Sequence, residues 1–481
     1  MKKNSVINNY LYNLSYQIFA VIVPLITTPY VSRVLLSKGV GIYSYTYTIA
    51  FAFSLFAALG INQYGQREIA YYQSDIKKRS NIFWELCIIR GCAVLIVLTA
   101  YLVSAFCYKG YRGYLLLQGF VVLAVLLDIS WFFQGIENFK TVAIRNIAVK
   151  IITVICVFIF VKDKSDVGNY ILLNSASVFV GNALFLFSLK GNVCKIRFSE
   201  LCIKRHIKPS FEFFIPLIAT QIYSQLDKIM LGAINNSMND NGYYEQARKI
   251  TNLLMTTITS LDSVLFSRVS YLYANNEKEK IAKAHKISFH IIMLMIWPMV
   301  IGLFVIAGNF VNWFFGPEYD KVVVLLRISC PLIIFMSIGN FVGMQYLSPT
   351  GQQNKMTLVY IIAACVNFVL NCLLIRRWAS IGALVASVLA ESVSCFLQVM
   401  LMKRSDYNFQ MMKGVWKYIL SSLIMGIAIW YMDNYISVRG WLLTLIEIII
   451  GAFIYIIMLI LMRDDMVVKV LKKSENTSSC Q

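Results

Sequence analysis

The chain has 481 residues, of which 58% are hydrophobic and 14% charged, and its mean hydropathy is +0.66. A soluble domain is about 45–50% apolar and about 25% charged, so this composition excludes an ordinary soluble protein. The formal charge is +20. In a membrane protein, an excess of Lys and Arg keeps the loops that carry it on the cytoplasmic side of the membrane. Because no basic soluble module is present to bind nucleic acid, no nucleic-acid partner is expected.

Cysteine and histidine give no sign of a bound metal. The 11 cysteines are scattered, without a C-x-x-C pair, and the 3 histidines are dispersed. We therefore expect neither a disulfide framework nor a metal site, and no cofactor.

Long apolar stretches recur along the whole chain, and each suits a bilayer core about 30 Å thick. They predict an all-α polytopic membrane protein with about fourteen transmembrane helices. The expected spans are residues 11–32, 41–63, 82–107, 114–134, 146–161, 169–189, 211–234, 244–270, 287–308, 322–346, 358–375, 381–402, 417–432 and 441–462.

The loops between these spans predict the orientation. Lys and Arg are concentrated in the loops on the same side as the N-terminus, which indicates that this side is cytoplasmic. Both termini are therefore expected in the cytoplasm. The longest loop, 190–210, is basic and lies near the middle of the chain.

This loop separates two similar halves. Pro24-Leu25-Ile26-Thr27-Thr28 in the first span matches Pro216-Leu217-Ile218-Ala219-Thr220 in the seventh. The two spans cross in the same direction, so the repeat is parallel, as in many transporters whose substrate site lies between the halves. The predicted domains are an N-terminal six-helix lobe (1–189), a basic cytoplasmic linker (190–210), a C-terminal six-helix lobe (211–402), and two extra helices with a cytoplasmic tail (403–481).

Proline interrupts the first and seventh spans at corresponding places. Pro24, Pro29 and Pro216 each remove a backbone donor and clash with the preceding turn. Interrupted helices in matching positions point to the moving parts of a transporter. We expect these three prolines to act as hinges.

Six segments in order resemble a known family. They include Thr28-Pro29-Tyr30-Val31 with Gly39-Val40-Gly41, Trp131-Phe132-Phe133-Gln134-Gly135, and Asp227-Lys228-Ile229-Met230, with further matches at 59–70, 242–247 and 349–352. The chain resembles the polysaccharide repeat-unit flippases, the O-antigen and capsule exporters of the multidrug/oligosaccharidyl-lipid/polysaccharide (MOP) superfamily. The family usually has Gly where this chain has Leu36, a departure that concerns loop geometry.

The resemblance implies a fold and a function. The implied fold is two six-helix lobes around a central cavity. The implied function is to move an undecaprenyl-pyrophosphate-linked oligosaccharide from the inner to the outer leaflet of a bacterial cytoplasmic membrane, by alternating access. Membrane lipid and a polysaccharide polymerase are the implied partners. The coupling ion, a proton or sodium, is left open.

Ionisable residues inside the spans are the candidate substrate ligands, because charges within a bilayer usually face a cavity or a partner. A pyrophosphate needs cations, and sugars need donors and acceptors. Asp128 and Glu391 are candidates for sugar hydroxyls or a coupling cation. For these two residues and for the four candidates named next, the alternative is an ion pair within the protein or a side chain that snorkels to the membrane interface as an anchor. The candidates for the pyrophosphate are Arg33, Arg90, Lys228 and Arg248.

Two other functions remain as alternatives. A peptidoglycan-precursor or multidrug exporter of the same superfamily would share the fold. A membrane glycosyltransferase or polymerase is disfavoured, because the predicted outer loops are short and carry no metal-ligand cluster, Gly-rich phosphate loop or nucleophile–base pair. The sequence therefore predicts a transporter and not an enzyme.

Overall fold

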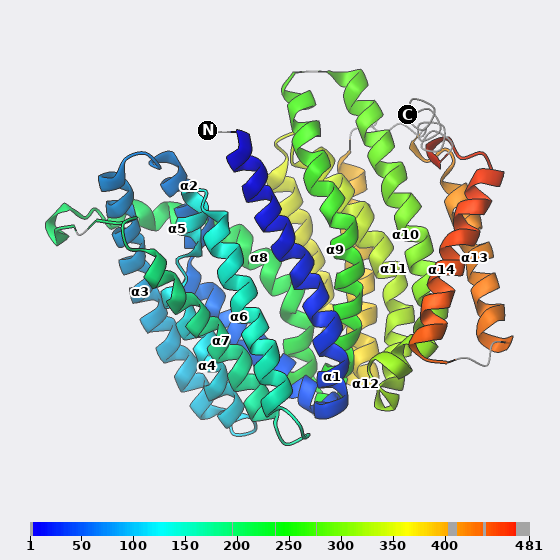
Figure 1. The fold of residues 1–481 in the computed structure, drawn as a ribbon, viewed down its shortest axis with the longest axis horizontal. Helices are drawn as coiled ribbons and strands as arrows, with labels where there is room; N and C mark the ends of the chain where they lie inside the picture. The colour runs from blue at the N-terminus through cyan, green and yellow to red at the C-terminus, as the bar shows by residue number, and fades with distance from the viewer. Residues whose placement is uncertain are drawn as a thin grey trace. The chain divides into compact units, whose positions relative to one another are not determined.

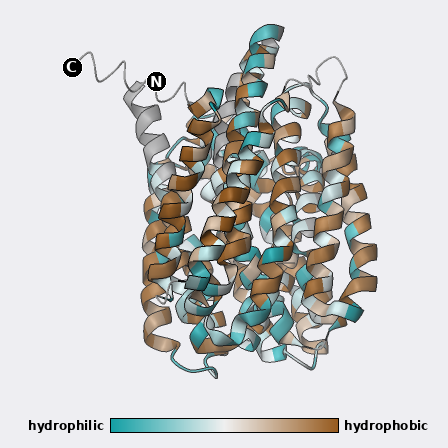
Figure 2. Ribbon diagram, turned by 90° about the vertical axis from the view of Figure 1, so that its right-hand side faces the viewer, coloured by the Kyte–Doolittle hydropathy of each residue, from teal (hydrophilic) through white to brown (hydrophobic). Residues whose placement is uncertain are grey.

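The computed structural model describes residues 3–194, 196–235, 237–275, 277–402, 411–435 and 439–467. Within these ranges the chain is helical and contains no β-strand, which confirms the predicted all-α fold. Ten of the described helices are long and apolar enough to cross a membrane, and Figure 2 shows apolar residues along them. The protein is therefore a multi-pass membrane protein. The predicted number of spans is not confirmed, and the predicted tail beyond residue 467 lies outside the described residues.

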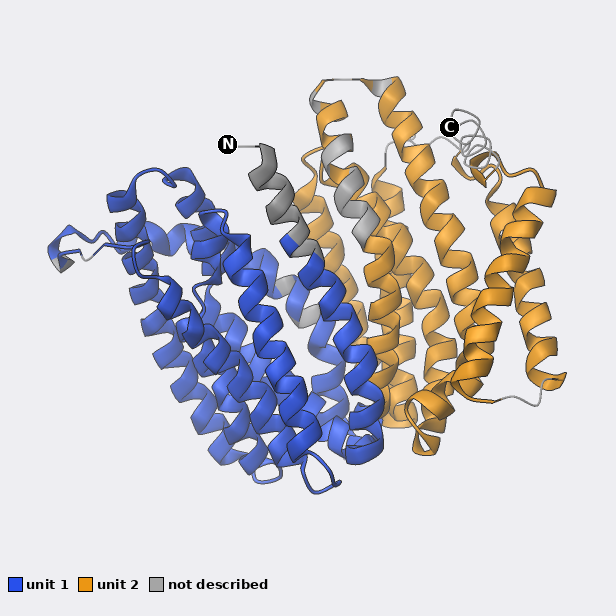
Figure 3. Ribbon diagram, viewed as in Figure 1, with its two compact units in different colours: residues 1–242 blue, residues 243–481 orange. Residues whose placement is uncertain are grey.

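The chain divides into two compact units, Met1–Gly242 (unit 1) and Tyr243–Gln481 (unit 2), as Figure 3 shows. The lobe boundaries at 189, 210 and 402 rest on the sequence repeat and stay a prediction. Unit 1 holds the helices up to α8: α1 (Lys3–Ala58), α2 (Ile61–Tyr71), α3 (Ile76–Cys107), α4 (Arg112–Leu127), α5 (Ser130–Gly135), α6 (Phe139–Phe160), α7 (Val167–Ser188), η1 (Phe198–Glu200) and α8 (Lys204–Ile234). Figure 1 labels the helices.

Unit 2 holds the remaining helices, although the first residues of α9 belong to unit 1. In chain order these are α9 (Met238–Ala274), α10 (Lys278–Phe314), η2 (Pro317–Tyr319), α11 (Asp320–Val342), η3 (Gly343–Leu347), α12 (Gln353–Leu401), α13 (Val415–Tyr435) and α14 (Trp441–Leu461).

Two pairs of predicted spans are joined without an intervening loop. Span 11–32 and most of span 41–63 lie in α1, which is broken by one non-helical residue, Leu36, with φ 58° and ψ 178°. Spans 358–375 and 381–402 share α12, which is broken by Ala379 at φ 50° and ψ −125°. Both breaks place a side chain at positive φ, a region that favours glycine.

A buried aromatic cluster forms part of the core of unit 1. The predicted span 114–134 is interrupted at Asp128, whose carboxylate accepts hydrogen bonds from the Ser130 N–H at 3.1 Å and the Ser130 hydroxyl at 2.6 Å. Such local bonds compete with the helix and begin a new one, α5. Helix α5 then contributes its aromatic residues to the core, beside residues of α2, α3 and α7: Trp131, Phe132 and Phe133 with Tyr64, Ile69, Phe83 and Phe185.

The basic linker 190–210 is fastened to unit 1 by a buried carboxylate. Glu85 of α3 accepts hydrogen bonds from the Cys202 N–H at 2.5 Å, the Arg205 guanidinium at 2.6 Å and His206 Nε2 at 2.6 Å. The other ring nitrogen, Nδ1 of His206, lies 2.6 Å from the Tyr64 hydroxyl. Burial and the positive charge of Arg205 lower the pKa of His206, and together they exceed the opposite effect of Glu85, which raises it. A neutral ring that donates from Nε2 to Glu85 and accepts from Tyr64 at Nδ1 satisfies both contacts.

Candidate functional site

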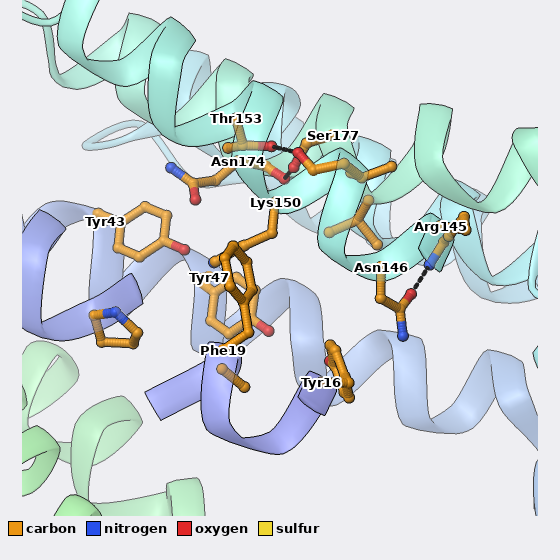
Figure 4. Close-up of a pocket in the computed structure, with 14 residues that line it drawn as sticks. Tyr16, Phe19, Tyr43, Tyr47, Arg145, Asn146, Lys150, Thr153, Asn174 and Ser177 are labelled. Atoms are coloured by element: carbon orange, nitrogen blue, oxygen red, sulfur yellow. Dashed lines mark hydrogen bonds between the residues drawn. The ribbon is translucent and has the colours of Figure 1, made fainter. Parts of the chain in front are cut away.

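Unit 1 contains a pocket of mixed polar and apolar lining between α1, α6 and α7, shown in Figure 4. Its volume is about 350 Å³, within the range of about 300–1,000 Å³ of small-molecule sites. The lining combines aromatic rings, amides, hydroxyls and two cations: Tyr16, Phe19, Ala20, Pro24, Tyr43, Tyr47, Arg145, Asn146, Val149, Lys150, Thr153, Asn174, Ser177 and Val178.

Helical spacing gathers these side chains on single faces. On α6, Asn146, Lys150 and Thr153 are four and three residues apart, so they share one side of the helix. Tyr43 and Tyr47 of α1 are also four residues apart, and their rings stack at 5.7 Å. A polar face on an otherwise apolar membrane helix normally points to protein or to a cavity, and here it lines the pocket.

Arg145 is held rigidly at one end of the pocket. Its guanidinium donates to the Gly181 carbonyl at 2.5 Å, to the Asn146 amide oxygen at 2.5 Å, and to the side chain of Asn182. It also lies 4.4 Å from the centre of the Phe185 ring. These hydrogen bonds fix the position of the guanidinium. Because the acceptors are neutral, they do not neutralise its charge, so Arg145 contributes a positive field to the pocket.

Lys150 is the cation of this pocket that has no hydrogen bond or ion pair within the described residues. Figure 4 shows its side chain extending from α6 toward Tyr43 and Tyr47. An ammonium group carries three donors and prefers an anionic or carbonyl acceptor. The arrangement therefore suits a ligand that combines a negative charge with hydroxyl groups.

None of the six sequence-predicted ligands is among the residues that line this pocket, although the predicted hinge Pro24 is. Arg33 is exposed on α1, and Lys228 is half-buried on α8, both in unit 1. Arg248 on α9 and Glu391 on α12 are half-buried in unit 2. Their proposed binding roles stay predictions.

Two of the predicted residues, Arg90 and Asp128, meet in a buried network in unit 1. Arg90 is 2% exposed and donates to the Asp128 carbonyl and, at 2.6 Å, to the amide oxygen of Asn62. Asn62 donates in turn to the Asp128 carboxylate at 3.1 Å, and the Arg90 guanidinium lies 5.8 Å from the centre of the Trp131 ring. In this conformation Arg90 ties α3 to the break between α4 and α5.

The structure shows no break at the predicted hinges themselves. Pro24 and Pro29 are inside α1, and the non-helical residue of that helix is Leu36, seven residues beyond Pro29. Pro216 is exposed within α8, which also contains Pro209. Hinge motion at these prolines therefore stays a prediction.

Sequence reasoning missed Arg145 and Lys150. Lys150 lies within the predicted span 146–161 and could have been found as an ionisable residue on the same helical face as Asn146 and Thr153. Arg145 lies one residue outside that span. Because α6 begins at Phe139, seven residues earlier than predicted, the structure places Arg145 inside the helix.

Comparisons with known proteins agree with the fold, which is one that helical membrane transporters adopt. The solved structure of the lipid II flippase MurJ in an inward closed conformation superposes with a TM-score of 0.73 at 18% identity, over 95% of this chain and 100% of that one. An inward-facing multidrug resistance MATE transporter of the MOP superfamily gives a TM-score of 0.57 at 14% identity, over 79% and 96%. These likenesses confirm the transporter fold.

Sequence comparison is more specific. The chain belongs to the polysaccharide biosynthesis protein family, whose pattern it matches over residues 6–272. It is 25% identical over 391 residues to a putative O-antigen transporter of Escherichia coli, covering 80% of this chain and 93% of that protein. It is also 25% identical over 303 residues to a probable low-salt glycan biosynthesis flippase of Haloferax volcanii, over 60% and 63%. The predicted family and the assignment as a transporter are confirmed.

Proposed function

We propose that this protein moves undecaprenyl-pyrophosphate-linked oligosaccharide repeat units from the inner to the outer leaflet of a bacterial cytoplasmic membrane, and that the pocket in unit 1 receives the head group. The observation that carries the proposal is the exposed Lys150 in a pocket of amides, hydroxyls and aromatic rings. A lipid-linked glycan combines a charged diphosphate with many hydroxyl groups, and this lining supplies partners for both.

The sugar would be held by short polar side chains and aromatic faces. Asn146 and Asn174 offer both donors and acceptors, and Thr153 adds a hydroxyl. The rings of Tyr43 and Tyr47 offer flat apolar surfaces with polar tips. The volume of about 350 Å³ suits one part of a head group, and the polyprenyl tail would stay in the lipid, where apolar side chains already face outward.

The negative charge would be held by the two cations. Lys150 would contact a phosphate oxygen directly, while the anchored Arg145 would lower the energy of the anion through its field. A charge-assisted hydrogen bond contributes about 1.5–3 kcal/mol, more than a neutral one. Lys150 therefore carries the largest single share of the expected recognition.

Transport would follow an alternating-access cycle in which α1 and α8 bend at Pro24, Pro29 and Pro216. Pro24 lines the pocket, so bending there would change its shape. The two predicted six-helix lobes, 1–189 and 211–402, would be the moving parts, with both termini in the cytoplasm. A polysaccharide polymerase would receive the flipped product.

The test uses a bacterial strain that lacks its own repeat-unit exporter and expresses this protein with candidate glycan gene sets. We expect Lys150→Gln to reduce surface polysaccharide at least about tenfold, the equivalent of about 1.4 kcal/mol, and to leave lipid-linked intermediate in the inner leaflet. Lys150→Arg keeps the charge and should retain much of the export. The control Lys164→Gln removes an exposed charge in the loop after α6, outside the pocket.

Wild-type export by Lys150→Gln would contradict the assignment of the pocket. Failure of the wild-type protein with every glycan set, despite confirmed insertion, would contradict the proposed substrate and point to a peptidoglycan-precursor or multidrug exporter.

A further inference from the structure

Three helices of unit 2, α10, α13 and α14, pack against one another and enclose a buried carboxyl group. Helix α14 is among the most apolar of the described helices. Its buried stripe consists of Leu443, Thr444, Glu447, Gly451, Tyr455 and Leu459. Glu447, at 0% exposure, occupies this stripe about two turns from the start of the helix.

Neither carboxyl oxygen of Glu447 has a hydrogen-bond partner among the described residues. The charged groups within electrostatic range are Asp433 and Arg439, which already pair with each other at 2.5 Å. Helix α10 contributes no ionisable side chain between residues 291 and 314. An ionised, unpaired carboxylate in such a place costs several kcal/mol, so the surroundings favour the protonated acid.

A polar route leads toward Glu447 from one end of the helix bundle. At the start of α14, Asn309 accepts from the Gly440 N–H at 3.0 Å and donates to the Gly440 carbonyl at 3.0 Å. The Thr444 hydroxyl accepts from Asn309 at 2.8 Å and from the Trp313 indole N–H at 2.9 Å. Glu447 follows Thr444 by three residues on the same face. This end corresponds to the predicted outer surface.

On the other side of Glu447, an apolar layer joins α13 and α14. A Cβ added at Gly451 would lie 2.9 Å from a side-chain atom of Ile429 and 3.4 Å from one of Met425, so these two helices touch there.

Beyond this layer lies a second group of ionisable side chains. The Tyr455 hydroxyl donates to the Leu294 carbonyl at 2.9 Å, and His290 Nδ1 lies 3.0 Å from the Tyr418 hydroxyl. The other ring nitrogen of His290 is buried without a partner among the described residues, and Asp464 is buried near Tyr418. Proton-exchanging groups thus occupy both sides of this α13–α14 contact, and acidic and histidine side chains inside a membrane are typical of proton relays in pumps and transporters.

We propose that Glu447 is a proton-binding site that a proton reaches from the end of the three-helix bundle at which Gly440 lies. Its protonation is coupled to the transport cycle. The coupling rests on the proposed export function, whereas proton binding does not. A sodium ion is the alternative occupant of the site, and the test below distinguishes it from a proton.

The direct test is infrared spectroscopy of the purified protein in lipid. We expect the wild type at neutral pH to show the carbonyl band of a protonated carboxylic acid, and Glu447→Gln to lack it. Glu447→Asp keeps a titratable group and should shift the band without removing it, which makes the assignment independent of how well the Gln variant folds. The control Glu318→Gln removes an exposed carboxylate of η2 and should leave the band unchanged.

Identical bands in the wild type and Glu447→Gln would overturn the proton site. A band that vanishes when sodium is added would also overturn it and assign the site to a metal cation. The coupling is tested separately in cells. A protonophore should slow wild-type export severalfold and leave export by Glu447→Gln unchanged, and equal sensitivity of the two proteins would overturn the coupling. Loss of export in the wild type itself, with the infrared band present, would contradict only the proposed substrate.

Discussion

Substitution of Gly41 by alanine should destabilise unit 1 strongly, because this glycine lies where two backbones cross. A Cβ at Gly41 would lie 1.7 Å from the carbonyl oxygen of Met238, and one at Gly242 would lie 1.9 Å from that of Ser37. The contact is therefore reciprocal between the second half of α1 and the start of α9. Both glycines belong to the sequence repeat, which matches Gly41-Ile42-Tyr43 with Gly242-Tyr243-Tyr244.

The size of the effect follows from the geometry. Ordinary van der Waals contact of a Cβ begins at 3.4 Å, so Gly41→Ala requires the backbones to separate by about 1.7 Å or to distort. Overpacking costs about 1–3 kcal/mol, and the upper end applies because the opposing atom belongs to the backbone and cannot rotate away. For a unit of this size, about 3 kcal/mol lowers the melting temperature by roughly 6–12 °C.

The assay is thermal unfolding of the purified protein in detergent, with Gly113→Ala as the matched control. A Cβ at Gly113, in the first turn of α4, meets nothing within 4 Å. Alanine there should be neutral or should stabilise by about 0.5–1 kcal/mol, the usual gain for replacing a helical glycine. If Gly41→Ala melts at the wild-type temperature, the close crossing of the two backbones is wrong.

Two further predictions concern local strain and pH. Leu36 adopts φ 58° and ψ 178°, a region that costs a non-glycine residue about 1–3 kcal/mol. Leu36→Gly should therefore be more stable than Leu36→Ala by about 1–2 kcal/mol in thermal unfolding. If Leu36→Ala is instead the more stable variant, as is usual inside a helix, the strain is refuted. Burial lowers the pKa of His206, so the unfolded chain binds more protons below about pH 6.5. Stability should then fall on acidification by at most about 1.4 kcal/mol per pH unit from this group, and His206→Gln should flatten that slope in melting curves measured from pH 7 downward.

Much of the fold could be predicted from hydropathy alone, because apolar length is what a bilayer demands of a helix. The ends of the elements could not. The predicted span 114–134 breaks at Asp128, whose carboxylate accepts hydrogen bonds from Ser130. The hydropathy of the surrounding apolar residues does not predict such a bond. Leu36 and Ala379 have positive φ values, which residues with a side chain rarely adopt. The residue types at these two positions therefore do not predict the breaks that the structure shows.

The candidate site was predicted only in its chemistry. Ionisable residues within the spans were the predicted ligands, which stays a prediction, and charge alone does not tell a ligand from an anchor. Arg90 is enclosed by Asn62 and Asp128, whereas Lys150 lines a pocket. The difference arises from contacts between residues far apart in the chain, which a single sequence does not show.

The pocket gives the proposed bending of α1 a physical link to ligand binding. Tyr16 and Phe19 precede Pro24, while Tyr43 and Tyr47 follow the break at Leu36, and all four line the same pocket as Lys150. A bend at Pro24 would move the first pair of rings relative to the others. A ligand can shift a conformational equilibrium only through different affinities for its states. A pocket lined from both sides of a bend provides such a difference, whereas a site lined by a single rigid helix would not.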